Sequence, residues 1–177
     1  MPLSDWVVIR VEASNYIGFG HMVRCFALAS SLTKKTNVMF FTDSEFVAEA
    51  CSKEGFNFLK CSDDIAGLRQ LNKENHRIKI ASMVIDTKSE YSADYVNRLK
   101  ALCQKIFFIE NVSQGTVIAD GIIFPAAHFD YHSVYGELEL SISSEKLIFG
   151  EKYVLIRDEL KNFSVGRGGG IVVTTGA

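Results

Sequence analysis

A histidine and an arginine lie three residues apart, directly after a turn that contains Gly18 and Gly20. The turn follows an apolar run over residues 6–11, which we expect to be a strand, and it opens an amphipathic stretch that we expect to be a helix. Free backbone N–H groups at a helix start favour an anionic ligand, and glycine lets that ligand approach the backbone. An imidazole has an ordinary pKa of about 6.5 and accepts a proton near neutrality. The pattern predicts a ligand site with His21 as a general base, although a histidine here can also merely cap the helix.

The second side chain of this pattern, Arg24, is open to two interpretations. It can clamp a phosphate or carboxylate of the ligand with two parallel hydrogen bonds, or it can form a structural ion pair with Glu12 or another acid. Asp86 and Glu110 each end a later apolar run, where strands of an open α/β sheet contact ligands. A carboxylate at that place can instead cap the following helix.

Other ligand motifs are incomplete. A dinucleotide-binding fingerprint lacks its third glycine, and a P-loop lacks Gly-Lys-Ser/Thr. The two histidines His128 and His132, with Asp130 between them, have a spacing that suggests a metal site, but no third ligand is evident, so we expect no bound metal and no cofactor.

Apolar runs and amphipathic stretches alternate along the chain, which is the pattern of βαβ units. We expect an α/β fold: a Rossmann-like, mainly parallel sheet with helices on both faces. The expected strands are residues 6–11, 37–42, 56–59, 81–86, 105–110 and, as the last, 121–125. The expected helices are residues 22–32, 44–55, 63–71 and 91–103.

Composition narrows the class of protein. The 177 residues are 47% hydrophobic and carry a net charge of -2, as in a globular chain, and a nucleic-acid-binding protein would usually be basic. No signal peptide and no apolar run of about 18 residues is evident, so we expect a cytoplasmic protein that binds no membrane. The four cysteines are scattered along the chain without a Cys-x-x-Cys pair, so they predict neither a zinc site nor disulfides.

The C-terminal residues differ from the rest. Residues 166–170 are Gly-Arg-Gly-Gly-Gly, which is typical of a flexible linker, and residues 171–177 form a fresh apolar run that leads into a glycine turn. We expect a domain over residues 1–161, and over 162–177 a linker with the first strand of a second domain. That C-terminal domain, absent from this chain, is the partner that we expect.

Residues 10–25 resemble the opening of a family of two-domain enzymes with the GT-B fold. These are the UDP-sugar hydrolases of pseudaminic acid biosynthesis and the related spore-coat polysaccharide proteins. Their signature is Arg-x-Asp-x-Ser followed by Gly-x-Gly-His-x-x-Arg-Cys. Weaker agreement follows at the strand that ends at Asp86, at residues 106–109 and at residues 149–160, so the resemblance covers the chain as an N-terminal domain.

The resemblance implies a reaction and a set of site residues. The reaction is metal-independent hydrolysis of the anomeric carbon–oxygen bond of a UDP-linked deoxy-diacetamido sugar, in which His21 activates water and the C-terminal half holds most of the UDP. The chain departs from the family at Glu12 (Asp in the family), at Asp86-Thr87-Lys88 (Asp-x-Tyr) and at Glu110-Asn111 (paired aspartates), which leaves the sugar open. The residues that we expect to contact substrate are Glu12, Ser14, Gly18, Phe19, Gly20, Arg24, Asp86 and Lys88.

Three functions fit these observations. The first is the N-terminal domain of a nucleotide-sugar hydrolase in surface-polysaccharide or nonulosonic acid biosynthesis, inactive and weak in UDP binding without its second half. The second is a GT-B glycosyltransferase domain, in which His21 deprotonates an acceptor. The third is a non-catalytic sugar-binding or interaction module.

Overall fold

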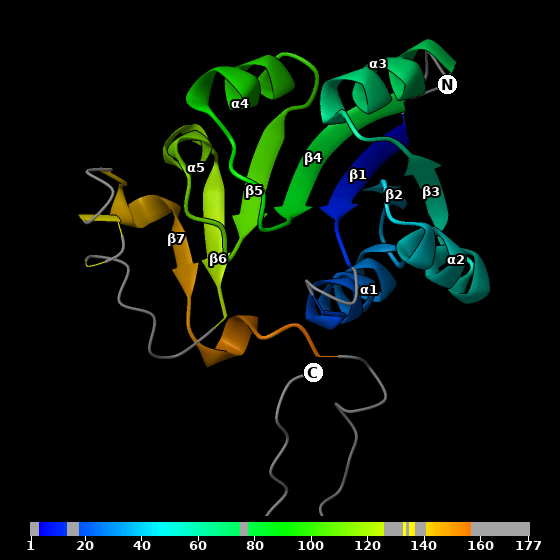
Figure 1. Cartoon of the computed structure of the whole chain (residues 1–177), viewed down its shortest axis with the longest axis horizontal. Helices are drawn as coiled ribbons and strands as arrows, with labels where there is room; N and C mark the ends of the chain where they lie inside the picture. Colours follow the sequence, from blue (N-terminus) through cyan, green and yellow to red (C-terminus); the bar gives the residue numbers. More distant parts are fainter. Residues whose placement is uncertain are drawn as a thin grey trace, which may run out of the picture.

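The computed structural model describes residues 4–13, 18–74, 78–125, 133, 135–136 and 141–156. These residues form one seven-stranded sheet flanked by helices (Figure 1). The strands are β1 (Ser4–Val11), β2 (Asn37–Thr42), β3 (Asn57–Lys60), β4 (Ile78–Asp86), β5 (Lys105–Ile109), β6 (Gly121–Phe124) and β7 (Leu147–Phe149). Every pair of neighbouring strands is parallel. The expected α/β, Rossmann-like architecture is confirmed.

The helices cover both faces of this sheet. They are α1 (Gly20–Leu32), α2 (Glu45–Glu54), α3 (Asp64–Glu74), α4 (Ala93–Lys100) and α5 (Gln114–Ile118), with short 3-10 turns η1 (Ser144–Lys146) and η2 (Glu151–Tyr153). Ala29 of α1 and Val47 of α2 pack with Ile9 in one apolar core. Leu68 of α3 and Leu99 of α4 belong to a second core on the other face. Full burial of such a side chain contributes roughly 1.5–3 kcal/mol, so both helix layers are firmly attached.

The strand order reverses between β1 and β4. The order is β3-β2-β1-β4-β5-β6-β7, so the chain runs outward from β1 in one direction and then from β4 in the other. The two strands end together, because Val11 lies beside Asp86 in the register. Ligands of open α/β sheets bind beyond the carboxyl ends of the strands at such a reversal. The fold therefore presents the residues after β1 and β4 to a ligand.

Several element limits follow the sequence closely. Helix α2 begins after Ser44, whose side chain accepts a hydrogen bond from the Val47 amide, and it ends at Gly55, which has the left-handed φ of 75°. Helix α4 is shorter than expected: Ser92 accepts from the Tyr95 amide and thereby sets the start of the helix. Side-chain caps, more than apolar periodicity, fix both helix starts.

Two elements were not expected. Helix α5 has five residues and no apolar period, and β7 has three residues. The expectation that residues 121–125 form the last strand was wrong, because Leu147 to Phe149 pair with β6. Such short segments carry too little pattern to be recognised.

Some expectations fall outside the described residues: Ser14, the His128–Asp130–His132 pattern, the linker and the C-terminal apolar run. Within the described ranges, the helices are all too short or too polar to cross a lipid bilayer.

Candidate functional site

The glycine turn after β1 opens α1 as the sequence predicts. Gly18 has a φ of 83°, in the left-handed region where only glycine is unstrained. Helix α1 starts at Gly20, and the Val23 amide donates to the Phe19 carbonyl at 3.0 Å. Phe19, the N-cap residue of this helix, makes no capping hydrogen bond with its side chain. His21 therefore lies in the first turn of α1, and its ring contacts β4 rather than the helix backbone.

His21 is held by the carboxylate that ends β4. Its Nδ1 lies 2.5 Å from Oδ1 of Asp86, which is fully buried, while the His21 side chain is 12% exposed. A charged carboxylate only accepts hydrogen bonds, so Nδ1 carries the proton and donates it. The second nitrogen, Nε2, is then the one with a lone pair. This arrangement fixes the tautomer that a general base needs.

Arg24, one turn along α1, binds the same carboxylate side-on. Its Nε donates to Oδ2 of Asp86 and its Nη2 donates to Oδ1, both at 2.6 Å. Its Nη1 donates to Oε2 of Glu110, the residue after β5. Nη2 also lies 3.1 Å from Nδ1 of His21. Because Nδ1 donates its hydrogen to Asp86, it has no lone pair that could accept a hydrogen bond from Nη2. We call His21, Arg24, Asp86 and Glu110 the His21 cluster.

The charges of this cluster stabilise one another. Burial raises the pKa of Asp86, but the hydrogen bonds from Arg24 and His21 more than offset it and hold the pKa below its ordinary value. For Arg24, burial lowers the pKa. The contacts of its guanidinium to Asp86 and Glu110 outweigh burial, so the pKa of Arg24 is raised above its ordinary value. The Cys25 thiol donates to Oδ2 of Asp86 at 3.3 Å, and burial followed by the Asp86 charge raises its pKa. Asp86 is therefore a charged acceptor with both oxygens occupied.

The expected catalytic residue, His21, and two of the residues expected to contact substrate, Arg24 and Asp86, come together in this cluster. Phe19 is 38% exposed, and its ring lies 4.6 Å from that of Phe46 on α2. A Cβ added to Gly20 would meet no atom within 4 Å, so the described protein atoms do not require glycine at that position. The described residues therefore leave space beside Gly20 in the first turn of α1.

Lys88 lies elsewhere at the same sheet edge, exposed on the turn that follows β4. Asn111, which is buried, donates from Nδ2 to the carbonyls of Thr87 and Ser89, each at 2.9 Å. The Ser89 hydroxyl donates to Glu12 at 3.3 Å. Lys88 therefore lies on a turn that hydrogen bonds connect to Asn111 and to Glu12.

Glu12 belongs to a second group of charges that the sequence analysis did not single out. We call it the Arg10 cluster: Arg10, Glu12, Asp43, Asp64 and Tyr91. Arg10 is 4% exposed, and its Nη1 donates to the Cys61 carbonyl at 2.6 Å. Its Nη2 lies 3.3 Å from Glu12 and 3.4 Å from Asp43. An arginine inside the apolar run of β1 was the signal for this cluster, because a buried charge requires partners.

The contact between Arg10 and Asp64 is loose. Nε of Arg10 and Oδ1 of Asp64 are 3.6 Å apart, and neither atom has a hydrogen-bond partner among the described residues. Burial raises the pKa of Asp64 to about 6, although Arg10 and the Tyr91 hydroxyl, 3.4 Å from Oδ2, lower it. This cluster ties the ends of β1, β2 and β3 to the start of α3.

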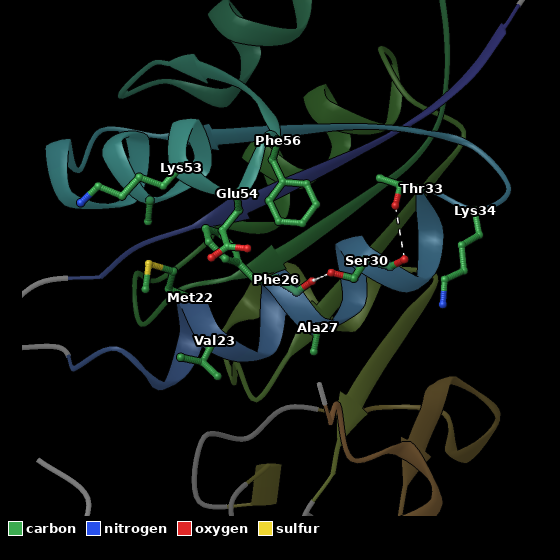
Figure 2. A pocket seen from close by; sticks show the side chains of 11 residues that line it. Met22, Val23, Phe26, Ala27, Ser30, Thr33, Lys34, Lys53, Glu54 and Phe56 are labelled. Atoms are coloured by element: carbon green, nitrogen blue, oxygen red, sulfur yellow. Dashed lines mark hydrogen bonds between the residues drawn. The ribbon is translucent and has the colours of Figure 1, made fainter. Parts of the chain in front are cut away.

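A hollow of about 570 Å³ lies near the site but is not formed by it. It runs between α1 and α2, and Figure 2 shows Phe56 and Glu54 directed toward α1. Its lining includes Met22 and Val23, which follow His21, but no member of the His21 cluster. The Ser30 hydroxyl on its wall is bound to the Phe26 carbonyl at 2.9 Å. We therefore place the candidate site at the carboxyl ends of β1 and β4 and not in this hollow.

Within the described residues, no three or more histidine, cysteine, aspartate or glutamate side chains are grouped so that they could hold a metal ion.

A distant relative of this chain is known. The chain is 25% identical over 161 residues to the uncharacterized protein MJ1062 of Methanocaldococcus jannaschii. The match covers 86% of this chain but 31% of that protein, so the chain spans about a third of the relative's length. No family model matches the chain.

Proposed function

We propose that this chain is the N-terminal domain of a nucleotide-sugar hydrolase that acts on a UDP-linked deoxy-diacetamido sugar. The observation that carries the proposal is the 2.5 Å contact between His21 Nδ1 and the buried Asp86 carboxylate at the end of β4, beside β1. It leaves Nε2 as a proton acceptor where open α/β sheets bind ligands. The resemblance of residues 10–25 to the hydrolases supplies the substrate class.

The proposed reaction uses this arrangement as follows. Nε2 of His21 removes a proton from a water molecule as its oxygen attacks the anomeric carbon. The bond between that carbon and the oxygen of the β-phosphate breaks, so the products are the free sugar and UDP. Asp86 stabilises the imidazolium that forms, and the proton then passes to solvent. Arg24 keeps Asp86 charged and oriented throughout, through its two bonds of 2.6 Å.

We also propose a second domain, a biosynthetic route and a compartment for this reaction. A second domain, contributed by the full-length protein, would supply the other wall of the cleft and most contacts to UDP. The sugar product would enter surface-polysaccharide or pseudaminic acid biosynthesis, and the protein would act in the cytoplasm.

The test is turnover of a panel of UDP-sugars by the full-length protein, with and without acceptor sugars, with UDP release measured by chromatography. Release of UDP and free sugar without an acceptor supports hydrolysis. Strict dependence on an acceptor would instead indicate a glycosyltransferase, and binding without either reaction would indicate a non-catalytic module.

Two variants assign the base. His21→Ala should lower kcat about 10²- to 10⁴-fold, the usual contribution of a general base. Lys35→Ala, at an exposed residue after α1, should leave turnover unchanged. Normal turnover by His21→Ala would contradict the proposal.

A further inference from the structure

We propose that Glu110 is a ligand-binding residue, whose carboxylate accepts hydrogen bonds from hydroxyl or amide N–H groups of a saccharide held beside His21. The saccharide class rests on the proposed function; the role of Glu110 rests on its own backbone, exposure and contacts.

The backbone of Glu110 is strained. Its φ of 49° is the one positive value recorded for a non-glycine residue in the described part of the chain. Glutamate is disfavoured in this left-handed region, and such residues persist where neighbours hold them, commonly at ligand sites. Here the Glu110 amide donates to the Ile123 carbonyl at 3.0 Å, and the next residue, Asn111, is bound to the turn after β4. The fold thus maintains a conformation that glycine would adopt freely.

The strained residue presents a carboxylate to solvent. The Glu110 side chain is 38% exposed, whereas Asp86, the other carboxylate on Arg24, is fully buried with both oxygens occupied. Arg24 Nη1 contacts Oε2 of Glu110, and a carboxylate has about four acceptor positions. Capacity therefore remains for donors from a ligand.

Glu110 lies close to the proposed base. One planar guanidinium connects the two: Nη1 of Arg24 donates to Glu110, and Nη2 lies 3.1 Å from His21 Nδ1. A ligand at Nε2 of His21 is thus within reach of a charged acceptor. Sugar hydroxyls and acetamido N–H groups are donors that match it.

The test uses the full-length protein and two probes, UDP-N-acetylglucosamine and N-acetylglucosamine, with binding measured by calorimetry and NMR. Glu110→Ala removes the carboxylate and keeps the strain, whereas Glu110→Gly removes both. Each should weaken binding of both probes by about tenfold or more, the usual effect of losing a hydrogen bond to a charged group. Glu110→Gln keeps an acceptor oxygen and should lose less.

Thermal unfolding tests the strain separately. Glu110→Ala and Glu110→Gly both lose the contact to Arg24, so the difference between their unfolding temperatures reports the backbone strain. Glu110→Gly should unfold at a temperature roughly 2–4 °C above Glu110→Ala. Equal midpoints, or a lower midpoint for the glycine variant, would refute the strain argument.

The outcomes separate this inference from the proposed function. If Glu110 acts only by holding Arg24, Glu110→Ala lowers kcat and leaves affinity unchanged, which overturns the inference. Wild-type protein that binds neither probe also overturns it. Wild-type protein that binds UDP-N-acetylglucosamine but hydrolyses no UDP-sugar refutes the proposed function alone, because the binding of the Glu110 variants still decides the role of this residue.

Discussion

The His21 cluster and the Arg10 cluster lie at the same edge of the sheet, and each surrounds an arginine with carboxylates. The first includes side chains of α1 and the second includes the first residue of α3, so they occupy opposite faces. Burial is similar at their centres: Asp86 is 0% exposed and Asp64 is 4% exposed. Their hydrogen bonding differs.

Both oxygens of Asp86 accept hydrogen bonds from Arg24 at 2.6 Å, whereas the nearest approach of Arg10 to Asp64 is 3.6 Å without a hydrogen bond. The pKa of Asp86 is accordingly lowered, and that of Asp64 is raised to about 6. Hydrogen-bond geometry therefore decides whether the pKa of a buried carboxylate lies above or below its ordinary value. One cluster holds a charged acceptor behind a histidine; the other ties strand ends together.

The largest expected effect on stability is at Arg24. Arg24→Ala leaves the Asp86 carboxylate buried without its two hydrogen bonds from the guanidinium, which should cost about 3–5 kcal/mol in the free energy of unfolding at pH 7. Urea unfolding measures this, and Arg24→Lys, which keeps the charge but not the side-on pair, should lie between. A loss below about 1 kcal/mol would show that Asp86 does not depend on Arg24.

Asp64 should show the opposite pH dependence from an ion-paired carboxylate. Because its pKa is raised to about 6 in the folded state from an ordinary 3.8, the folded protein binds the proton more tightly. Stability is then lost as the pH rises between these values. Relative to Asp64→Asn, the wild type should lose on the order of 2–3 kcal/mol between pH 4 and pH 7, measured by urea unfolding. A difference that is constant with pH would contradict the raised pKa.

The turn after β4 should show a smaller effect. Asn111→Ala removes two donors from the carbonyls of Thr87 and Ser89 and should cost about 1–3 kcal/mol in thermal unfolding. Ser89→Ala breaks only contacts of 3.3 and 3.4 Å to Glu12 at an exposed residue and should change stability by less than about 0.5 kcal/mol. Equal losses would show that Asn111 does not hold the turn.

The sequence predicted the elements that bear both clusters, but not their contacts. Hydrophobic periodicity located β1, α1 and β4, and the glycine turn located His21. Which acid pairs with Arg24 depends on the strand order, because Asp86 reaches α1 only when β4 lies beside β1. Both interpretations of Arg24 were open, and the structure shows it bound to Asp86 and Glu110 rather than to Glu12.

The partners of Arg10 and the strain at Glu110 were beyond sequence reasoning for the same physical reason. Arg10 gathers residues that follow three different strands, and the φ of Glu110 depends on how the chain leaves β5. Arg10 within an apolar run indicates a buried charge, but neither the identity of its partners nor the strain at Glu110 leaves a local pattern of residue types.

The most direct test of the account compares kcat of Asp86→Asn and Asp64→Asn in the full-length protein, with the UDP-sugar that the wild type hydrolyses. Asp86→Asn keeps the shape but loses the charge that fixes the His21 tautomer, so kcat should fall about 10²- to 10⁴-fold. Asp64→Asn should keep kcat within about threefold, because Asp64 belongs to the Arg10 cluster and not to the His21 cluster. Wild-type turnover by Asp86→Asn, or equal losses in both variants, would contradict a catalytic role for the His21–Asp86 pair.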